Sequence, residues 1–250
     1  MFPLRYLQSG HVLITPEDDC DEVVDALLET DYNEEFCIAM EFDTDFISRL
    51  MEAGFLVMST EIKDDAPDDV SDGVQADEET VLPPFFVLLP KLHLVRSALF
   101  FPELQIKKSI RKFLSCYELR FNEDFNFILG KCVEIHGAAW LTPPLVGILK
   151  EMHQNAASIK AMPVSFGLYR EGKLVAGEIG VVAGKVYTSY SGYREEDNAG
   201  TVQMILMTQW LEKNGFAFLD FGMPLPYKTD LGAQDITPEH FVELFRSAKD

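Results

Sequence analysis

The chain has 250 residues, of which 47% are hydrophobic, and its formal net charge at pH 7 is −20. This length suits one large domain, or one domain with a smaller companion. No apolar run is long enough to cross a membrane, and the N-terminus lacks the apolar core and cleavage site of a secretory signal. We therefore expect a cytoplasmic protein without membrane contact. The four cysteines form no CxxC pair, which argues against a zinc cluster and favours free thiols in a reducing compartment.

The negative charge is concentrated in the N-terminal third. Residues 1–80 hold 23 acidic and 3 basic residues, whereas residues 81–250 hold 18 of each. Because fields are screened over about 10 Å at ordinary salt, a local basic patch on the neutral part can still attract phosphate. The overall charge therefore does not exclude a nucleic-acid partner.

Residues 1–60 predict a small α/β domain with helices over 22–28 and 45–53. Residues 61–82 follow as an acidic stretch that is poor in apolar residues, which predicts a flexible insertion. A calcium loop is the alternative explanation for so many aspartates, but their spacing lacks the alternating ligands and closing Glu of such loops. Residues 83–250 then form the second domain.

A basic segment opens the second domain. Residues 84–90 form an apolar run between prolines, which predicts a strand, and residues 106–114 predict an amphipathic helix. Six basic residues and one acidic residue lie between Lys91 and Lys112, and Arg96 is one of the six. Four of them share one side of the predicted helix: Lys107, Lys108, Arg111 and Lys112. A solvated helix face is the ordinary explanation, but the contrast with the acidic N-terminal third favours phosphate contact.

Two more helices are predicted before the central part of the domain. The first covers residues 124–135, and the second runs from Pro144 to about His153. The loop between them carries Trp140, one of two tryptophans in the chain. A single tryptophan is more often a core residue than a ligand platform.

Residues 163–232 organise the chain. Turn signals at Glu171-Gly172 and Ala183-Gly184 separate three β-rich runs, which predicts an antiparallel meander. A helix follows over residues 198–213, and the apolar run at 216–221 predicts a buried strand that carries Asp220. A meander, a helix and a strand that ends at a polar residue resemble acyltransferases of the N-acetyltransferase (GNAT) type. The fold class that we expect is thus α/β (α+β), with a GNAT-like domain after the small N-terminal domain.

An ordered series of segments from about Leu94 onward resembles the leucyl/phenylalanyl-tRNA–protein transferase family. The matching segments include residues 96–113, Tyr117-Glu-Leu-Arg-Phe, Ala139-Trp140-Leu141-Thr142, Leu149–His153, Lys173-Leu-Val-Ala-Gly, Gly184-Lys-Val-Tyr, Asn198-Ala199, Leu219-Asp220 and Asp230-Leu-Gly-Ala233. The resemblance implies a GNAT-like enzyme that moves Leu, Phe or a related amino acid from aminoacyl-tRNA to the N-terminal amine of a protein and marks that protein for degradation. It implies no cofactor and no metal, and we expect a monomer.

The chain departs from the family at the reacting centre. The Glu of the family's Ser-Val-Glu strand is absent near Ser165-Phe166-Gly167, and its Asp-Cys-Gln becomes Asp220-Phe221-Gly222. Glu178 lies in an otherwise apolar strand, where a charged residue is costly unless it is exposed or paired. It is therefore a candidate replacement for the missing carboxylate, and a solvated sheet face is its alternative position.

The resemblance assigns roles to individual residues. Asp220, with Glu178, would accept the proton of the attacking amine, and we expect Asp220 to be open to solvent on one side, so that Asp220→Asn folds normally. Its alternative role is a turn cap. Trp140 would stack on the terminal adenine of the tRNA. The expected donor pocket consists of Met152, Met162, Phe166, Tyr187 and Ser189.

Two other functions fit the same fold. An acetyltransferase that uses acyl-CoA needs a Gly-rich turn before the helix at 198–213 to bind pyrophosphate. The chain has Arg194-Glu-Glu-Asp-Asn-Ala-Gly200 there, and three carboxylates would repel a pyrophosphate. A non-catalytic binding module is the third hypothesis, and the lost Glu and Gln favour it.

Overall fold

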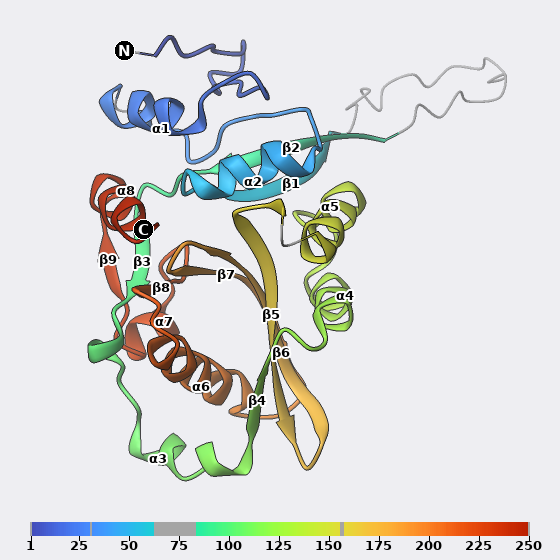
Figure 1. Ribbon diagram of the computed structural model, residues 1–250, viewed down its shortest axis with the longest axis vertical. Coiled ribbons are helices and arrows are strands. Elements are labelled where there is room, and N and C mark those ends of the chain that lie inside the picture. Colours follow the sequence, from blue (N-terminus) through green and yellow to red (C-terminus); the bar gives the residue numbers. More distant parts are fainter. Residues whose placement is uncertain (1, 31, 63–83, 156–157, 250) are drawn as a thin grey trace, which may run out of the picture.

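The computed structural model describes residues 2–30, 32–62, 84–155 and 158–249. Figure 1 shows a large curved sheet flanked by helices, with a smaller layer of N-terminal elements at one end. The large sheet has seven strands in the order β4-β5-β6-β7-β8-β3-β9, and a second sheet pairs β1 with β2. The predicted insertion at 61–82 lies almost entirely outside the described residues.

The N-terminal layer contains helices α1 (Cys20–Glu29) and α2 (Thr44–Glu52) and strands β1 (Leu56–Ile62) and β2 (Phe85–Lys91). The carboxylates of Asp19 and Asp43 accept hydrogen bonds from backbone amides of the first turns, so both helices begin at an N-cap. β1 and β2 pair antiparallel along their whole length. The boundary predicted at residue 83 assigns β2 to the second domain, whereas its pairing joins it to the N-terminal elements.

The seven-stranded sheet is built around the predicted meander. Its strands are β3 (Arg96–Leu99), β4 (Glu118–Phe121), β5 (Ala161–Arg170), β6 (Lys173–Ala183), β7 (Val186–Arg194), β8 (Phe218–Asp220) and β9 (Gln234–Ile236). β5, β6 and β7 pair antiparallel, whereas β7 and β8 pair parallel. The helix α6 (Ala199–Lys213) connects the parallel pair. This order of meander, helix and parallel strand confirms the GNAT-like α/β class predicted from the sequence.

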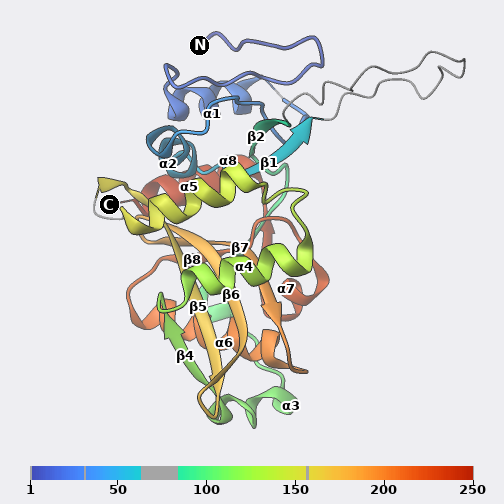
Figure 2. The ribbon, with the colours of Figure 1, turned by 90° about the vertical axis from the view of Figure 1, so that its right-hand side faces the viewer.

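Helices cover both faces of this sheet. Figures 1 and 2 show α4 (Phe125–His136) and α5 (Pro143–Gln154) beside β5 and β6, with α6 on the opposite side. α7 (Pro226–Asp230) and α8 (Pro238–Ser247) follow β8 and β9, and short 3₁₀ turns η1 (Phe101–Glu103) and η2 (Leu114–Cys116) precede β4. Two apolar cores result, one on each face of the sheet.

The helix predicted over residues 106–114 is much shorter in the structure. Only α3 (Lys108–Arg111) is helical. Lys107 at its N-cap position makes no side-chain capping bond, and the first turn carries no acidic residue. Without either form of N-terminal stabilisation, the few residues available do not offset the cost of helix nucleation.

No helix in the described parts of the chain is long and apolar enough to cross a membrane.

Candidate functional site

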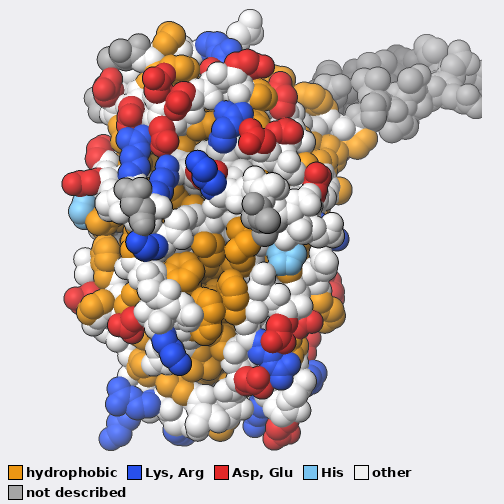
Figure 3. All heavy atoms as spheres, in the orientation of Figure 1, with side chains coloured by type: hydrophobic (Ala, Val, Ile, Leu, Met, Phe, Trp, Pro, Cys, Tyr) orange, Lys and Arg blue, Asp and Glu red, His pale blue; other side chains and the backbone are white. Residues whose placement is uncertain are grey.

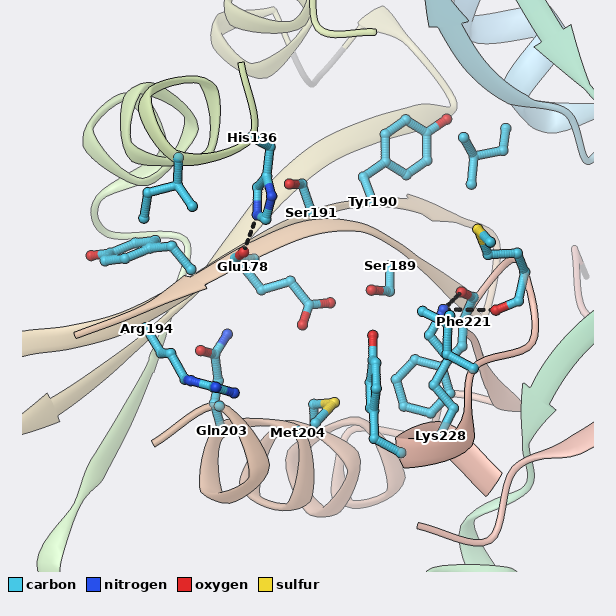
Figure 4. A pocket seen from close by; sticks show the side chains of 18 of the residues that line it. His136, Glu178, Ser189, Tyr190, Ser191, Arg194, Gln203, Met204, Phe221 and Lys228 are labelled. Atoms are coloured by element: carbon cyan, nitrogen blue, oxygen red, sulfur yellow. Dashed lines mark hydrogen bonds between the residues drawn. The ribbon is translucent and has the colours of Figure 1, made fainter. Parts of the chain in front are cut away.

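A cavity of about 840 Å³ lies where β6 and β7 meet α6, α7, the Trp140 loop and the N-terminal layer. Figure 4 shows its interior, with Glu178 on one side and Lys228 on the other. Its polar lining consists of Lys91, His93, His136, Glu178, Ser189, Ser191, Arg194, Thr201, Gln203 and Lys228. Its aromatic lining consists of Trp140, Tyr190, Tyr193, Phe221 and Tyr227. The cavity therefore combines aromatic and aliphatic side chains with polar and charged groups, as ligand sites do.

A bulge in β7 shapes one wall of the cavity. Ile179 pairs with Ser191 and Gly180 pairs with Ser189, so Tyr190 is the extra residue between them. The Tyr190 hydroxyl accepts a hydrogen bond of 3.1 Å from the Val57 amide of β1, which joins the bulge to the N-terminal layer. A Cβ at Gly180 would lie 2.4 Å from the Thr188 carbonyl oxygen, so only glycine fits at this position without a clash.

Glu178 reaches the cavity from the middle of β6 and is only 6% exposed. The Tyr187 hydroxyl donates to its Oε1 over 3.2 Å. No Lys, Arg or His nitrogen lies within salt-bridge distance of this carboxylate in the part of the chain that the structure describes. Burial raises the pKa of Glu178 to about 7, although hydrogen bonds from Ser189 and Tyr187 and the positive charge of Lys228 oppose the rise. Glu178 is thus a carboxylate that can gain or lose a proton near neutral pH.

Lys228 lies in α7 across the cavity from Glu178 (Figure 4) and is 6% exposed. Its ammonium donates to the carbonyl oxygens of Phe221 and Met223 over 2.7 and 2.8 Å. Burial lowers the pKa of this amine, and the negative charges of Glu178 and Asp220 partly counter the decrease. The cation therefore closes the 221–225 loop on itself while its head group faces the cavity.

Asp220 does not have the environment that the sequence predicted. It is 0% exposed, and both its oxygens bind Arg96: Nε to Oδ1 at 2.9 Å and Nη2 to Oδ2 at 2.6 Å. The Thr188 hydroxyl and the Gly222 amide each donate a further bond of 2.9 Å. Burial raises the pKa of Asp220, but Arg96 and these hydrogen bonds together lower it below its usual value. The expectation of a solvent-open carboxylate is wrong, because Arg96 is buried beside it.

The cavity brings together some of the predicted site residues and leaves others out. Glu178, Trp140 and Ser189 line it, whereas Asp220 does not. Four residues of the expected donor pocket lie elsewhere in the packed interior: Met152, Met162, Phe166 and Tyr187. Tyr187 still acts on the cavity indirectly, because its hydroxyl holds Glu178.

The predicted phosphate-binding residues lie outside the cavity. Lys107, Lys108, Arg111 and Lys112 are all exposed around α3, and Figure 3 shows Lys and Arg side chains gathered at that end of the molecule. Lys107 pairs with Asp230 at 2.5 Å. Lys107 also lines a smaller cavity of about 200 Å³ that shares Thr201, Met204 and Tyr227 with the large one. Arg96, counted with this basic segment in the sequence, instead forms the buried pair with Asp220.

His93 and Lys228 are the main lining residues that the sequence analysis missed. His93 is 4% exposed, and its Nε2 has no hydrogen-bond partner in the described structure. Burial, with the positive charges of Arg96 and Lys91, lowers the pKa of His93 to about 3, so the imidazole stays neutral. No local pattern marks either residue, because each reaches the cavity from a loop or a five-residue helix. Among the described residues, no cluster of three or more His, Cys, Asp or Glu is placed to hold a metal ion.

Comparison with known proteins places the second part of the chain in one family. The family model described as leucyl/phenylalanyl-tRNA protein transferase matches residues 98–246, more than half of the chain. The protein of Pseudomonas paraeruginosa named leucyl/phenylalanyl-tRNA–protein transferase is 27% identical to this chain over 160 residues. The match covers 62% of this chain and 69% of that protein. The corresponding protein of Azotobacter vinelandii is 28% identical over 151 residues, covering 58% of this chain and 65% of its own length. The matched segments thus span about two thirds of these relatives.

Solved structures show a weaker likeness. The crystal structure of FemX is 11% identical with a TM-score of 0.44, covering 94% of this chain and 82% of that chain. L-PGS from Bacillus licheniformis is 11% identical with a TM-score of 0.42, covering 99% and 89%. The family match over residues 98–246, together with the GNAT-like topology of the same residues, shows that the chain belongs to the leucyl/phenylalanyl-tRNA protein transferase family.

Proposed function

We propose that the protein transfers the amino acid of an aminoacyl-tRNA to the N-terminal amine of an acceptor protein, and so marks that protein for degradation. The observation that carries the proposal is Glu178, a buried carboxylate with a pKa of about 7 in the wall of an 840 Å³ cavity. The attacking group is an α-amine with a pKa near ~8, so a large fraction is already neutral at cytoplasmic pH. A carboxylate with a pKa near neutrality is matched to take the proton that the amine loses on attack.

Most of the rate enhancement comes from holding the amine and the ester together, which can supply about 7–11 kcal/mol. The half-buried Trp140 lines the cavity, and we assign it the terminal adenine of the tRNA, because stacking of a base on an aromatic ring contributes about 1–3 kcal/mol. Ser189 lies beside Glu178 and belongs to the donor pocket. We assign the exposed Lys107, Lys108, Arg111 and Lys112 to the tRNA backbone, with no cofactor in the reaction.

In this proposal Asp220 has a structural role in place of the catalytic role predicted from the sequence. Its carboxylate is enclosed by Arg96, Thr188 and Gly222 and is absent from the cavity lining. We propose that Asp220 fixes the end of β8 and the loop that carries Phe221 toward the cavity. Glu178 then remains as the residue that exchanges a proton with the substrate.

The test is transfer from a panel of charged tRNAs, leucyl-tRNA and phenylalanyl-tRNA included, to peptides that differ in their first residue. We expect a new amide bond with at least one donor, and a decrease of about 10²–10⁴-fold in single-turnover rate for Glu178→Gln. The matched control is Glu239→Gln, which removes a carboxylate from the first turn of α8. Transfer of acetyl groups from acetyl-CoA in place of aminoacyl groups would favour the acetyltransferase, and no turnover of either donor would favour the binding module.

A basic donor amino acid is a second candidate. A buried carboxylate without a cation within salt-bridge distance among the described residues suits the side chain of a cationic ligand. The panel separates the two roles of Glu178. As a proton acceptor, Glu178→Gln slows transfer from every donor alike. As a side-chain counter-ion, it slows only arginyl and lysyl donors and leaves the apolar donors unchanged.

The basic segment gives an independent test of the tRNA partner. Each phosphate contact releases counterions, so charge reversal at Lys108 and Arg111 weakens tRNA binding and flattens its dependence on salt by about one slope unit per contact. Charge reversal at the exposed Lys213, at the far end of α6, is the control. An unchanged salt slope would remove α3 from the binding surface. We place the enzyme in the cytoplasm, where charged tRNA is found, and propose that it acts as a monomer.

A further inference from the structure

The ammonium group of Lys228 has more hydrogen-bonding capacity than its loop uses. A lysine carries three N–H donors, and the carbonyl oxygens of Phe221 and Met223 accept two of them. Within the described residues, no third acceptor lies at hydrogen-bond distance. Lys228 is only 6% exposed, so bulk water does not solvate the remaining donor freely. A buried cation with a spare donor at a cavity wall is arranged to receive an acceptor atom from a ligand.

The position of Lys228 fits the polarity change of the proposed reaction. Aminolysis of an ester creates positive charge on the attacking nitrogen and negative charge on the carbonyl oxygen. The cavity has a carboxylate, Glu178, on one side and the Lys228 ammonium on the other (Figure 4). Its remaining polar lining near α7 is neutral: the Tyr227 hydroxyl and the His93 imidazole. Lys228 is the lining cation that α7 contributes, whereas Lys91 and Arg194, which also line the cavity, lie on β2 and β7.

We infer that Lys228 binds the carbonyl oxygen of the aminoacyl ester and stabilises the negative charge that develops on it, an inference that rests on the proposed transfer reaction. The neutral amine attacks the ester carbon, and the π pair of the carbonyl moves to the oxygen that Lys228 holds. The nitrogen then loses a proton to Glu178. Collapse re-forms the carbonyl and breaks its bond to the ribose oxygen, which takes the proton from Glu178. The products are an amide and a tRNA with a free hydroxyl.

Lys228→Met tests this role, because methionine keeps the apolar stem and removes the charge. Loss of one hydrogen-bond donor to a developing oxyanion lowers the rate of the chemical step by about 10²–10³-fold. We expect this decrease in single-turnover transfer from the most active charged tRNA of the panel. Binding of the corresponding 3′-aminoacylamino-adenosine, an amide analogue that cannot react, should change by less than about fivefold. Lys228→Arg, which keeps a cation, should recover at least tenfold of the lost rate, and Lys213→Met is the control for loss of one surface charge.

Lys228→Gln covers the case in which the methionine variant does not fold. Its neutral amide carries two N–H donors for the loop carbonyls, so we expect its melting temperature to lie closer to that of wild type than the methionine variant's does, while its rate falls. A rate within threefold of the Lys213→Met control would overturn the inference. So would a loss of analogue binding as large as the loss of rate, because that result would mean that Lys228 only shapes the loop. Wild-type protein that transfers from no charged tRNA would reject the proposed function, whereas active wild type with active Lys228 variants would reject the inference alone.

Discussion

Asp220 and Glu178 are two buried carboxylates in neighbouring parts of one sheet, and they have opposite environments. Asp220 accepts hydrogen bonds from Arg96, Thr188 and Gly222 and pairs with a buried guanidinium, and its pKa is lowered. Glu178 is held by hydroxyl groups without a salt-bridge partner among the described residues, and its pKa is raised to about 7. Both are almost completely buried, so burial alone does not decide whether the pKa is raised or lowered. The direct ion pair with Arg96, which Asp220 has and Glu178 lacks, makes the difference.

This comparison assigns different roles to the two residues. A carboxylate with a lowered pKa and four hydrogen bonds stays ionised and holds structure in place. A carboxylate that titrates near neutrality in a cavity can exchange a proton with a ligand. We therefore propose that Asp220 holds the end of β8 in place and that Glu178, on β6, carries the proton chemistry.

The largest expected effect is the loss of stability in Asp220→Asn. An amide at this position leaves the Arg96 charge buried without a full counter-charge, and breaking a buried pair costs about 3–5 kcal/mol. Urea unfolding monitored by circular dichroism measures the change. Asp235→Asn is the control, since Asp235 is exposed on β9, which β3 separates from β8. A decrease below about 1 kcal/mol would remove the contrast between the two carboxylates.

Glu178→Gln should act in the opposite direction at high pH. The folded-state pKa of Glu178 is raised from 4.5 to about 7, so the folded protein binds this proton more tightly than the unfolded chain does. Its ionisation therefore costs stability progressively as the pH rises from about 4.5 to 7, by about 3 kcal/mol in total. Glutamine avoids this cost. We expect Glu178→Gln to be more stable than wild type at pH 8, with a difference that shrinks toward pH 5, and equal stability at both pH values would contradict the raised pKa.

Local patterns were enough to predict the frame of the site. The turns at Glu171-Gly172 and Ala183-Gly184 and the helix after Asn198 lie where the sequence placed them. Glu178 was identifiable because a charge in an apolar strand is unusual. The pairing of Asp220 with Arg96 was not, because the two residues are 124 positions apart and meet only through β8 and β3. The sequence analysis did not identify Lys228 as a site residue for a related reason, since the contacts of Lys228 depend on how the 221–225 loop folds back.

Tyr187→Phe is the smallest and most specific change to the comparison. The Tyr187 ring is 0% exposed and stays packed in the variant, and the hydroxyl that donates to Glu178 is lost. This hydrogen bond lowers the pKa of Glu178, so its removal raises that pKa further. Net hydrogen bonds contribute about 1 kcal/mol, which corresponds to less than about one pH unit. The neighbouring charge of Lys228 and the Ser189 hydroxyl are unchanged.

If the Glu178 carboxylate is the proton acceptor, the single-turnover rate of wild type rises with pH through about 7, and in Tyr187→Phe the same rise moves to higher pH. Single-turnover rates measured from about pH 5.5 to about pH 8.5, a range that spans the titration of Glu178, give the size of the shift. The matching rates of Glu178→Gln isolate the part of the profile that belongs to the acceptor amine. A profile in Tyr187→Phe that coincides with wild type, in a protein that melts at the same temperature, would mean that the titrating group in transfer is not Glu178.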